Sequence, residues 1–329
     1  MKTIPELFLD QVAAKPSETS IHIKRSGAFT SLTWQEVHAD VRRYLANLLR
    51  LGVVQGDRVV QFSENRYEWI LADTAMHILG AVHVPVHSTL SGAQVVEQAI
   101  DSGAEVLLVS CEALLQKLEQ SSQKLPNAIS VHSFEAATAS DGNPVPLFDQ
   151  ADVDLAAAEE LEASVAERIQ ADTYATILYT SGTTGEPKGV ILNQRNIVTN
   201  SVTANDAIGQ TSADLRLNLL PLSHIFARTA DLYSWIAGGS QLALAESRES
   251  VIADAQEIKP TIVNAVPYFY ARIQKALEEK GAADAPGTVK SLLGGRVRFC
   301  CSGGAPLTCL LYTSPSPRDL STSRMPSSA

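Results

Sequence analysis

Helix-like and strand-like segments alternate along the first part of the chain. Apolar residues recur at helical spacing from Val37 to Leu49, and Gly52 follows as a stop signal. Further apolar runs predict strands at 58–62, 81–86 and 105–109 and helices at 67–79 and 93–100. Strands that alternate with helices favour a mostly parallel, twisted sheet with helices on both faces.

The alternation weakens between Leu118 and about Ala171, where we expect a surface loop followed by a solvated, acidic helix. A second alternation begins at Tyr174. It predicts strands at 176–180, 215–220, 241–245, 261–266 and 296–301, and helices at 197–207, 225–236, 251–258 and 268–279. The sequence therefore predicts an α/β fold with two lobes, at 1–171 and 172–307, each built on a mostly parallel sheet.

The densest group of chemically useful residues lies between Tyr179 and Val190. Glycines let backbone N–H groups approach an anion, hydroxyls add donors, and a lysine supplies a mobile charge. The residues concerned are Thr180, Ser181, Gly182, Thr183, Thr184, Gly185, Lys188 and Gly189. Lys188 is followed by glycine, so the pattern is not the Walker A motif. We predict a loop that binds polyphosphate; a plain Gly/Thr hairpin turn is the alternative.

Three segments carry a resemblance to a known family. Residues 180–189, Thr-Ser-Gly-Thr-Thr-Gly-Glu-Pro-Lys-Gly, resemble the phosphate-loop signature of the adenylate-forming superfamily, the AMP-dependent synthetases and ligases. Residues 221–228, Pro-Leu-Ser-His-Ile-Phe-Ala-Arg, resemble the acyl-site segment of long-chain acyl-CoA synthetases, and residues 302–307 resemble the loop that packs on adenine. The resemblance extends from residue 1 to about 307.

The resemblance implies the αβαβα N-terminal domain of acyl-activating enzymes, incomplete in this chain. It implies ATP, Mg²⁺, a fatty acid and coenzyme A as ligands, with acyl-adenylate as the intermediate. The loop would hold the β- and γ-phosphates, Thr180 would lie at the metal, and His224 and Lys188 would be catalytic. The adenine contacts would come from Ser302, Gly303, Gly304, Ala305 and Pro306. Arg228 could belong to the site or form a structural ion pair.

Several family elements have no counterpart in the sequence. It contains no Tyr-Gly-x-Thr-Glu segment, and the ribose-binding Asp, the hinge and the C-terminal domain with its catalytic Lys are not found. We therefore expect a long-chain fatty acid–CoA ligase by family, of which this chain is an inactive portion. The alternatives are another adenylating ligase that loads a carrier protein, and a non-catalytic nucleotide-binding fragment.

The last residues, 308–329, break the alternation. Pro315, Pro317 and Pro326 prevent a continuous helix, and the Ser-rich composition offers no apolar face to bury. This stretch also resembles the translation of a sequencing-library adapter. We expect a disordered, non-native tail; a natural disordered tail is the alternative.

Composition narrows the choice of partners. The 329 residues carry a net charge of −10 and no polybasic cluster, which argues against nucleic acid as a ligand. Four cysteines without a Cys-x-x-Cys pair are typical of a reducing compartment. No apolar run has the length of a transmembrane helix, and the N-terminus does not resemble a signal peptide. We expect a cytoplasmic protein that could touch membranes peripherally to reach its substrate.

Overall fold

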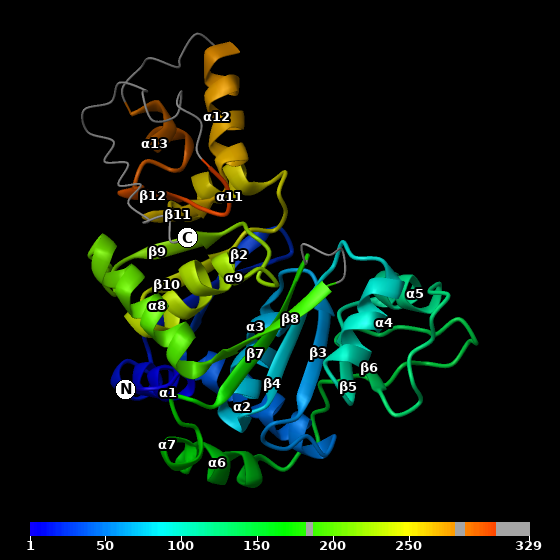
Figure 1. Cartoon of the computed structure of the whole chain (residues 1–329). Coiled ribbons are helices and arrows are strands. Elements are labelled where there is room, and N and C mark those ends of the chain that lie inside the picture. The colour runs from blue at the N-terminus through cyan, green and yellow to red at the C-terminus, as the bar shows by residue number, and fades with distance from the viewer. Residues whose placement is uncertain (182–186, 280–286, 307–329) are drawn as a thin grey trace.

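The computed structural model describes residues 1–181, 187–279 and 287–306, and contains two six-stranded sheets with helices packed on them (Figure 1). One sheet has the order β6-β5-β3-β4-β7-β8 and the other β12-β11-β9-β10-β1-β2. The strands of the first are β3 (Arg58–Ser63), β4 (Val82–His87), β5 (Val106–Val109), β6 (Ser130–Ser133), β7 (Tyr174–Ser181) and β8 (Pro187–Asn193). Those of the second are β1 (Thr19–Arg25), β2 (Ala28–Thr33), β9 (Leu215–Asn218), β10 (Gln241–Leu244), β11 (Ile262–Ala265) and β12 (Phe299–Ser302).

Within the described residues both sheets are parallel except at one edge each. The antiparallel hairpin β7–β8 ends the first sheet, and the hairpin β1–β2 ends the second. Strand β4 is parallel to β7, with His83 opposite Thr176, and β1 is parallel to β10, with Ile21 opposite Leu242. The predicted class, two mostly parallel sheets flanked by helices, is confirmed.

The sheets do not follow the expected boundary near residue 171. Strands β1 and β2 come from the start of the chain, yet they extend the sheet of β9 to β12. Strands β7 and β8 lie beyond residue 171, yet they extend the sheet of β3 to β6. Each half of the chain thus lends a hairpin to the sheet built mainly by the other half, a pairing that local sequence patterns do not encode.

The helices are placed between and outside the sheets. Their bounds are α1 (Ile4–Ala14), α2 (Trp34–Arg50), α3 (Tyr67–Leu79), α4 (Gly92–Asp101), α5 (Glu112–Glu119), α6 (Leu155–Ala163), α7 (Val165–Arg168), α8 (Gln194–Ile208), α9 (Ile225–Ala227), η1 (Arg228–Tyr233), α10 (Ser234–Gly238), α11 (Val251–Ile258), α12 (Pro267–Glu279) and α13 (Thr288–Leu292). None of these helices is long and apolar enough to cross a membrane.

Alternating strand residues face different apolar clusters, which defines the layers. Val59 of β3 belongs to a central cluster with α1, α2 and α3, whereas its neighbour Val60 packs with α4 and α5 on the outer face. In the second sheet, Leu242 faces the central cluster and Ala243 the outer cluster with α11 and α12. The result is a five-layer arrangement in which a helical layer is buried between two sheets (Figure 1).

The central layer contains the largest buried side chains. Trp34 at the start of α2 stacks on Trp235 of α10 with ring centroids 4.9 Å apart, and both are fully buried. Trp69 of α3 is also fully buried. Helix α2 begins at a capping box in which Thr33 and Glu36 satisfy each other's backbone N–H groups. Aromatic stacking in this layer joins the helices that separate the two sheets.

Several elements escape the sequence prediction. The helix expected at 225–236 is interrupted, because Arg228–Tyr233 form a π-helix between α9 and α10. Helix α1, the hairpin β1–β2 and strands β6 and β8 are not predicted; of these strands, β2, β6 and β8 lie at sheet edges. Residues 308–329, expected to be disordered, lie outside the described residues.

Candidate functional site

The Gly- and hydroxyl-rich motif lies on the hairpin β7–β8. Thr180 of β7 is paired with Lys188 of β8, and Ser181 with Pro187. Thr180 and Lys188 are both exposed. The predicted residues Gly182, Thr183, Thr184 and Gly185 fall outside the described residues. The strands on either side of these residues pair as an antiparallel hairpin, and the binding of polyphosphate by the motif stays a prediction.

Gly189 has a steric role inside this hairpin. A Cβ at this position would lie 2.9 Å from Ile177 Cγ2 and 3.3 Å from Tyr179 Cζ. The hydroxyl of Tyr179 in turn donates a hydrogen bond of 2.6 Å to Asp101 Oδ2 at the end of α4. These contacts hold the hairpin against α4, so the glycine is required by packing whatever else it contacts.

His224 lies at the edge between the two sheets, close to His87. Strand β4 ends at His87, and the two imidazole rings have centroids 6.5 Å apart in an edge-on arrangement. Because His83 is opposite Thr176 and the strands are parallel, His87 and Thr180 lie at the same edge four residues further on. Burial, followed by the nearby His224 and Arg248, lowers the pKa of His87.

His224 also caps the short helix α9. Its Nδ1 accepts a hydrogen bond of 3.2 Å from the backbone N–H of Phe226, and the side chain is exposed. This bond leaves Nε2 as the ring nitrogen available for an external partner. Its backbone carbonyl accepts from Arg228 N–H at 3.1 Å, which fixes one helical turn between the two residues.

The predicted adenine segment meets the His224 segment directly. Ser302 ends β12, and Gly303 N–H donates to the carbonyl of Ala265 on the neighbouring β11 at 3.2 Å. A Cβ at Gly303 would lie 2.5 Å from Phe226 Cζ, so the glycine permits this ring to pack on the loop. Gly304 has φ of 78°, a conformation that other residues rarely adopt. Ala305 and Pro306 are exposed.

The described residues of the three predicted segments thus lie on the same side of the molecule, at the carboxyl-terminal ends of the strands. We call this side the rim and define it by Thr180, His87, His224, Phe226 and Gly303. Open parallel sheets bind ligands at this end of their strands. A cavity of about 180 Å³ opens at the rim, lined by Ser63, Glu64, Asn65, Ser88, Leu219, Pro221, Ser223, Ala245, Glu246, Ser247 and Arg248.

Asn65 joins the two sheets at this cavity. Its Nδ2 donates to Asn218 Oδ1 at 2.8 Å and to the Leu220 carbonyl at 2.7 Å, and its Oδ1 accepts from Leu222 N–H at 2.7 Å. Asn65 follows β3, whereas its partners belong to the end of β9 and the loop after it. Three hydrogen bonds from one side chain therefore set the spacing between the sheets at the rim.

Arg228 is buried in a structural cluster, which settles the alternative left open by the sequence. It has no exposed surface; Nη2 donates to Asp73 Oδ1 at 2.6 Å and Nη1 to Thr176 Oγ1 at 2.8 Å. Burial opposes the charge on Asp73, but the Arg228 guanidinium, His77 and His83 together outweigh it and hold the pKa of Asp73 below its ordinary value. His83 contacts Asp73 at 2.6 Å, and burial lowers the pKa of His83 to about 4.

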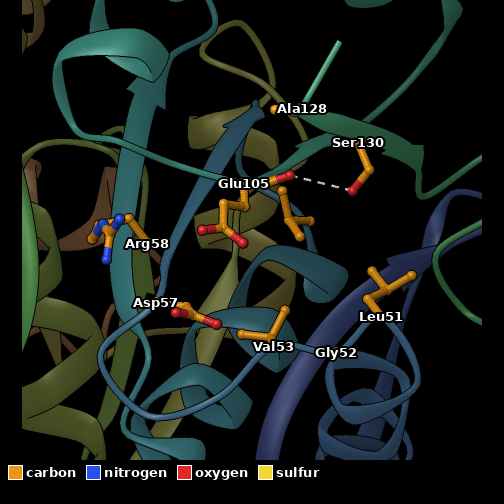
Figure 2. Close-up of a pocket in the computed structure, with 9 residues that line it drawn as sticks. Leu51, Gly52, Val53, Asp57, Arg58, Glu105, Ala128 and Ser130 are labelled. Atoms are coloured by element: carbon orange, nitrogen blue, oxygen red, sulfur yellow. Dashed lines mark hydrogen bonds between the residues drawn. The ribbon is translucent and has the colours of Figure 1, made fainter. Parts of the chain in front are cut away.

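A second cavity lies at the opposite ends of the strands (Figure 2). It has a volume of about 160 Å³ and is lined by residues at the starts of β3, β5 and β6, including Asp57, Arg58, Glu105 and Ser130. The Ser130 hydroxyl donates to the backbone carbonyl of Glu105 at 3.3 Å (Figure 2). None of the predicted site residues lines this cavity.

Two residues, His87 of the rim and Asn65 of the adjacent cavity, were missed by the sequence reasoning. His87 ends a strand with no recognisable ligand spacing, and only the approach of the second sheet brings it to His224. Asn65 lies in the segment Glu64-Asn-Arg-Tyr-Glu-Trp69, directly after β3. The position of both residues after predicted strands was the one signal that could have found them.

The chain has two mostly parallel sheets with a helical layer between them. This arrangement is the N-terminal fold of adenylate-forming enzymes. The model of the AMP-binding enzyme family matches residues 8–312. The chain belongs to this family.

Relatives and solved structures agree with this assignment. The chain is 30% identical over 266 residues to the long-chain-fatty-acid–CoA ligase FadD15 of Mycobacterium bovis, covering 80% of this chain and 43% of FadD15. It is 25% identical over 293 residues to human long-chain-fatty-acid–CoA ligase ACSBG1, covering 85% of this chain and 40% of ACSBG1. The inhibitor-bound N-terminal domain of FACL13 from Mycobacterium tuberculosis superposes with a TM-score of 0.70 at 22% identity. The match covers 94% of this chain and 72% of the FACL13 chain. The chain spans about two fifths of the length of these curated ligases.

Proposed function

We propose that this chain is the nucleotide- and acid-binding portion of a long-chain fatty acid–CoA ligase. The whole protein would activate a fatty acid with ATP to an acyl-adenylate and pass the acyl group to coenzyme A. The observation that carries the proposal is the convergence of the hairpin, the His224 segment and the 302–306 loop on one rim. The names of the relatives support fatty acids as the substrate class.

The rim suits the chemistry of adenylation, which requires positioning and charge neutralisation. Lys188 is exposed at the end of the hairpin, where its ammonium is free to neutralise phosphate charge. Thr180, paired with it, adds a hydroxyl donor on the same edge. His224 presents Nε2, which could donate to the oxygen atoms of the reacting carboxylate or phosphate.

The 302–306 loop offers a place for a flat ring. Gly303 and Gly304 carry no side chain, and Gly304 is exposed next to the exposed Ala305 and Pro306. Phe226 supports the loop from beneath through Gly303. We propose that adenine lies on this loop, with the phosphates directed toward the hairpin and the carboxylate toward His224.

A protein-bound metal fits the described residues poorly. No group of three or more His, Cys, Asp or Glu side chains in residues 1–181, 187–279 and 287–306 could hold a metal ion. Thr180 supplies one hydroxyl oxygen, and Mg²⁺ usually keeps waters and substrate phosphates as ligands. We therefore propose that Mg²⁺ arrives as part of the nucleotide ligand.

The test is ATP binding to the chain, measured by calorimetry with Mg²⁺ present. Lys188→Ala should weaken binding by about 1–3 kcal/mol, the scale of a lost charge-assisted hydrogen bond. Lys290→Ala is the matched control, because Lys290 is exposed on α13, which leads into the opposite end of β12. Equal affinities for the two variants would refute the assignment of Lys188.

Substrate class is tested separately, by saturation with palmitate, with a hydroxybenzoate and with an amino acid in the presence of ATP. Preference for palmitate supports the fatty acid assignment. Preference for either other acid would favour the alternative of a carrier-protein-loading ligase. Acyl-CoA formation is assayed with the same acids.

A further inference from the structure

A buried polar cluster lies one layer beneath the rim. Arg228, Asp73, His83 and Thr176 have at most trace exposure and come from η1, α3, β4 and β7. Arg228 contacts the other three: Asp73 at 2.6 Å, Thr176 at 2.8 Å and His83 Nδ1 at 3.2 Å. Thr176 also donates to the His83 carbonyl at 2.7 Å. The guanidinium therefore touches both neighbouring strands β4 and β7 as well as helix α3.

Three members of this cluster share a fixed spacing to the rim. Each of the three is four positions in sequence from a residue of the rim and lies on the same strand or segment as that residue. The pairs are Thr176 with Thr180 on β7, His83 with His87 on β4, and Arg228 with His224 on the segment after β9. Four residues span about 13 Å along a strand and about 6 Å along a helix. Arg228 is thus the point where the two strand ends and the His224 segment are joined.

A contribution to the stability of the fold does not by itself explain why these buried residues are charged and polar. Taking Arg228 and Asp73 out of water costs several kcal/mol per ion, and apolar residues of similar volume often serve equally well at such sites. Three polar atoms of the cluster, Arg228 Nε, His83 Nε2 and Asp73 Oδ2, also lack a hydrogen-bond partner among the described residues. Unpaired buried polar atoms are costly, which favours a geometric role for the pairs that are made.

We propose that Arg228 is a positioning residue that fixes the hairpin carrying Thr180 and Lys188 relative to His224. Its planar fork bonds Asp73 with one nitrogen and Thr176 with the other, so that a displacement of β7 moves the helix that His224 caps. Asp73 supplies the counter-charge that holds the fork in place. This role deepens the proposed function and rests on it, because the two segments so aligned are those assigned to phosphate and carboxylate.

The decisive variant is Thr176→Val, which keeps the side-chain shape and leaves the Arg228–Asp73 pair intact. Thr74→Val is the matched control: Thr74 is equally buried, next to Asp73, and its hydroxyl bonds only the Ile70 carbonyl of its own helix. Amide hydrogen exchange is followed in the hairpin and in residues 225–233, and ATP affinity is measured in parallel. A purely structural role predicts the same exchange and affinity in the two variants.

We expect Thr176→Val to exchange about tenfold faster or more in both segments and to bind ATP about tenfold more weakly or more, because it removes both the bond from Arg228 and the bond to the His83 carbonyl. Thr74→Val should leave both measurements near wild type. Arg228→Lys should behave as Thr176→Val, because an ammonium keeps the charge but cannot bond both partners in one plane. Exchange and affinity unchanged in Thr176→Val would overturn the positioning role.

The two proposals fail in different ways. If wild-type chain binds no ATP but Thr176→Val accelerates exchange in both segments, the proposed function is wrong and the mechanical link stands. If ATP binding depends on Lys188 but Thr176→Val changes neither measurement, the link is wrong and the proposed function stands. If Arg228→Lys does not fold, the exchange and affinity measured for Thr176→Val still test the positioning role.

Discussion

Asp231 gives a quantitative prediction, because it is a fully buried carboxylate held by neutral partners. Its Oδ1 accepts from Asn264 Nδ2 at 2.6 Å and its Oδ2 from Asn218 Nδ2 at 2.8 Å. Burial raises its pKa from 3.8 to about 6, and the charge of Arg216 and the two amides offset burial only in part. The folded protein therefore holds a proton on Asp231 more tightly than the unfolded chain does.

This difference in proton affinity sets the direction in which the stability of the fold changes with pH. Below pH 3.8 the group is protonated in both states and has no effect on stability. As pH rises toward 6 the unfolded chain releases the proton first, so folding loses stability, and the loss is complete above the folded pKa. A shift of about two units corresponds to about 3 kcal/mol, of which about 2 kcal/mol develops between pH 4 and pH 7.

Asp231→Asn removes the titration while keeping the shape. The substitution can also change stability by an amount that does not depend on pH. The difference between the free energy of unfolding of the variant and that of wild type should therefore be compared across pH, and it should increase by about 2 kcal/mol from pH 4 to pH 7. Urea unfolding at four pH values measures this difference. Asp254→Asn is the control of opposite sign: burial would raise the pKa of Asp254, but its hydrogen bonds with Lys24, at 2.6 Å, with Ser250 and with the Glu246 N–H together outweigh burial and lower the pKa. Parallel pH curves for wild type and Asp231→Asn would refute the reasoning.

Two further predictions concern the contacts that assemble the rim. Gly303→Ala should lower the free energy of unfolding by about 1–3 kcal/mol, because its Cβ would lie 2.5 Å from the Phe226 ring, and adding Phe226→Leu should recover part of the loss in thermal unfolding. Asn65→Ala should cost about 1–3 kcal/mol in urea unfolding, because it leaves Leu222 N–H unpaired, whereas Asn143→Ala, in an exposed loop, should have no measurable effect. An unfolding curve like that of wild type would contradict the close packing at Gly303 in the first variant, or the hydrogen bond from Leu222 to Asn65 in the second.

The sequence predicts the elements of this molecule better than their assembly. Helices α3 and α11 and strand β3 agree with their apolar patterns to within a residue, since period and stop signals are local. The exchange of hairpins between sheets is not local, because β1 meets β10 more than two hundred residues away. The same limit hides the approach of His87 to His224, which depends on how the two sheets pack.

Arg228 illustrates why the buried polar residues could not be placed from the sequence. In an expected helix at 225–236, an arginine next to apolar residues fits a solvent-facing stripe as well as an ion pair. The π-helix changes the register of that stripe, and the helix lies between two sheets, so both of its sides are covered. Charge patterning alone does not reveal a helix buried on all sides.

The two links between the sheets converge on the same short segment. Asn65 ties the end of β3 to the loop after β9, and Arg228 ties β7 to the helix that begins just after this loop. Residues 219–228 are therefore held at both ends by the sheet that carries the hairpin, although β9 belongs to the other sheet. A ligand that bridges hairpin and His224 would act on a segment already fixed to both sheets, so binding there need not order the segment first. Weakening either link should therefore reduce ligand affinity even though neither Asn65 nor Arg228 need touch the ligand.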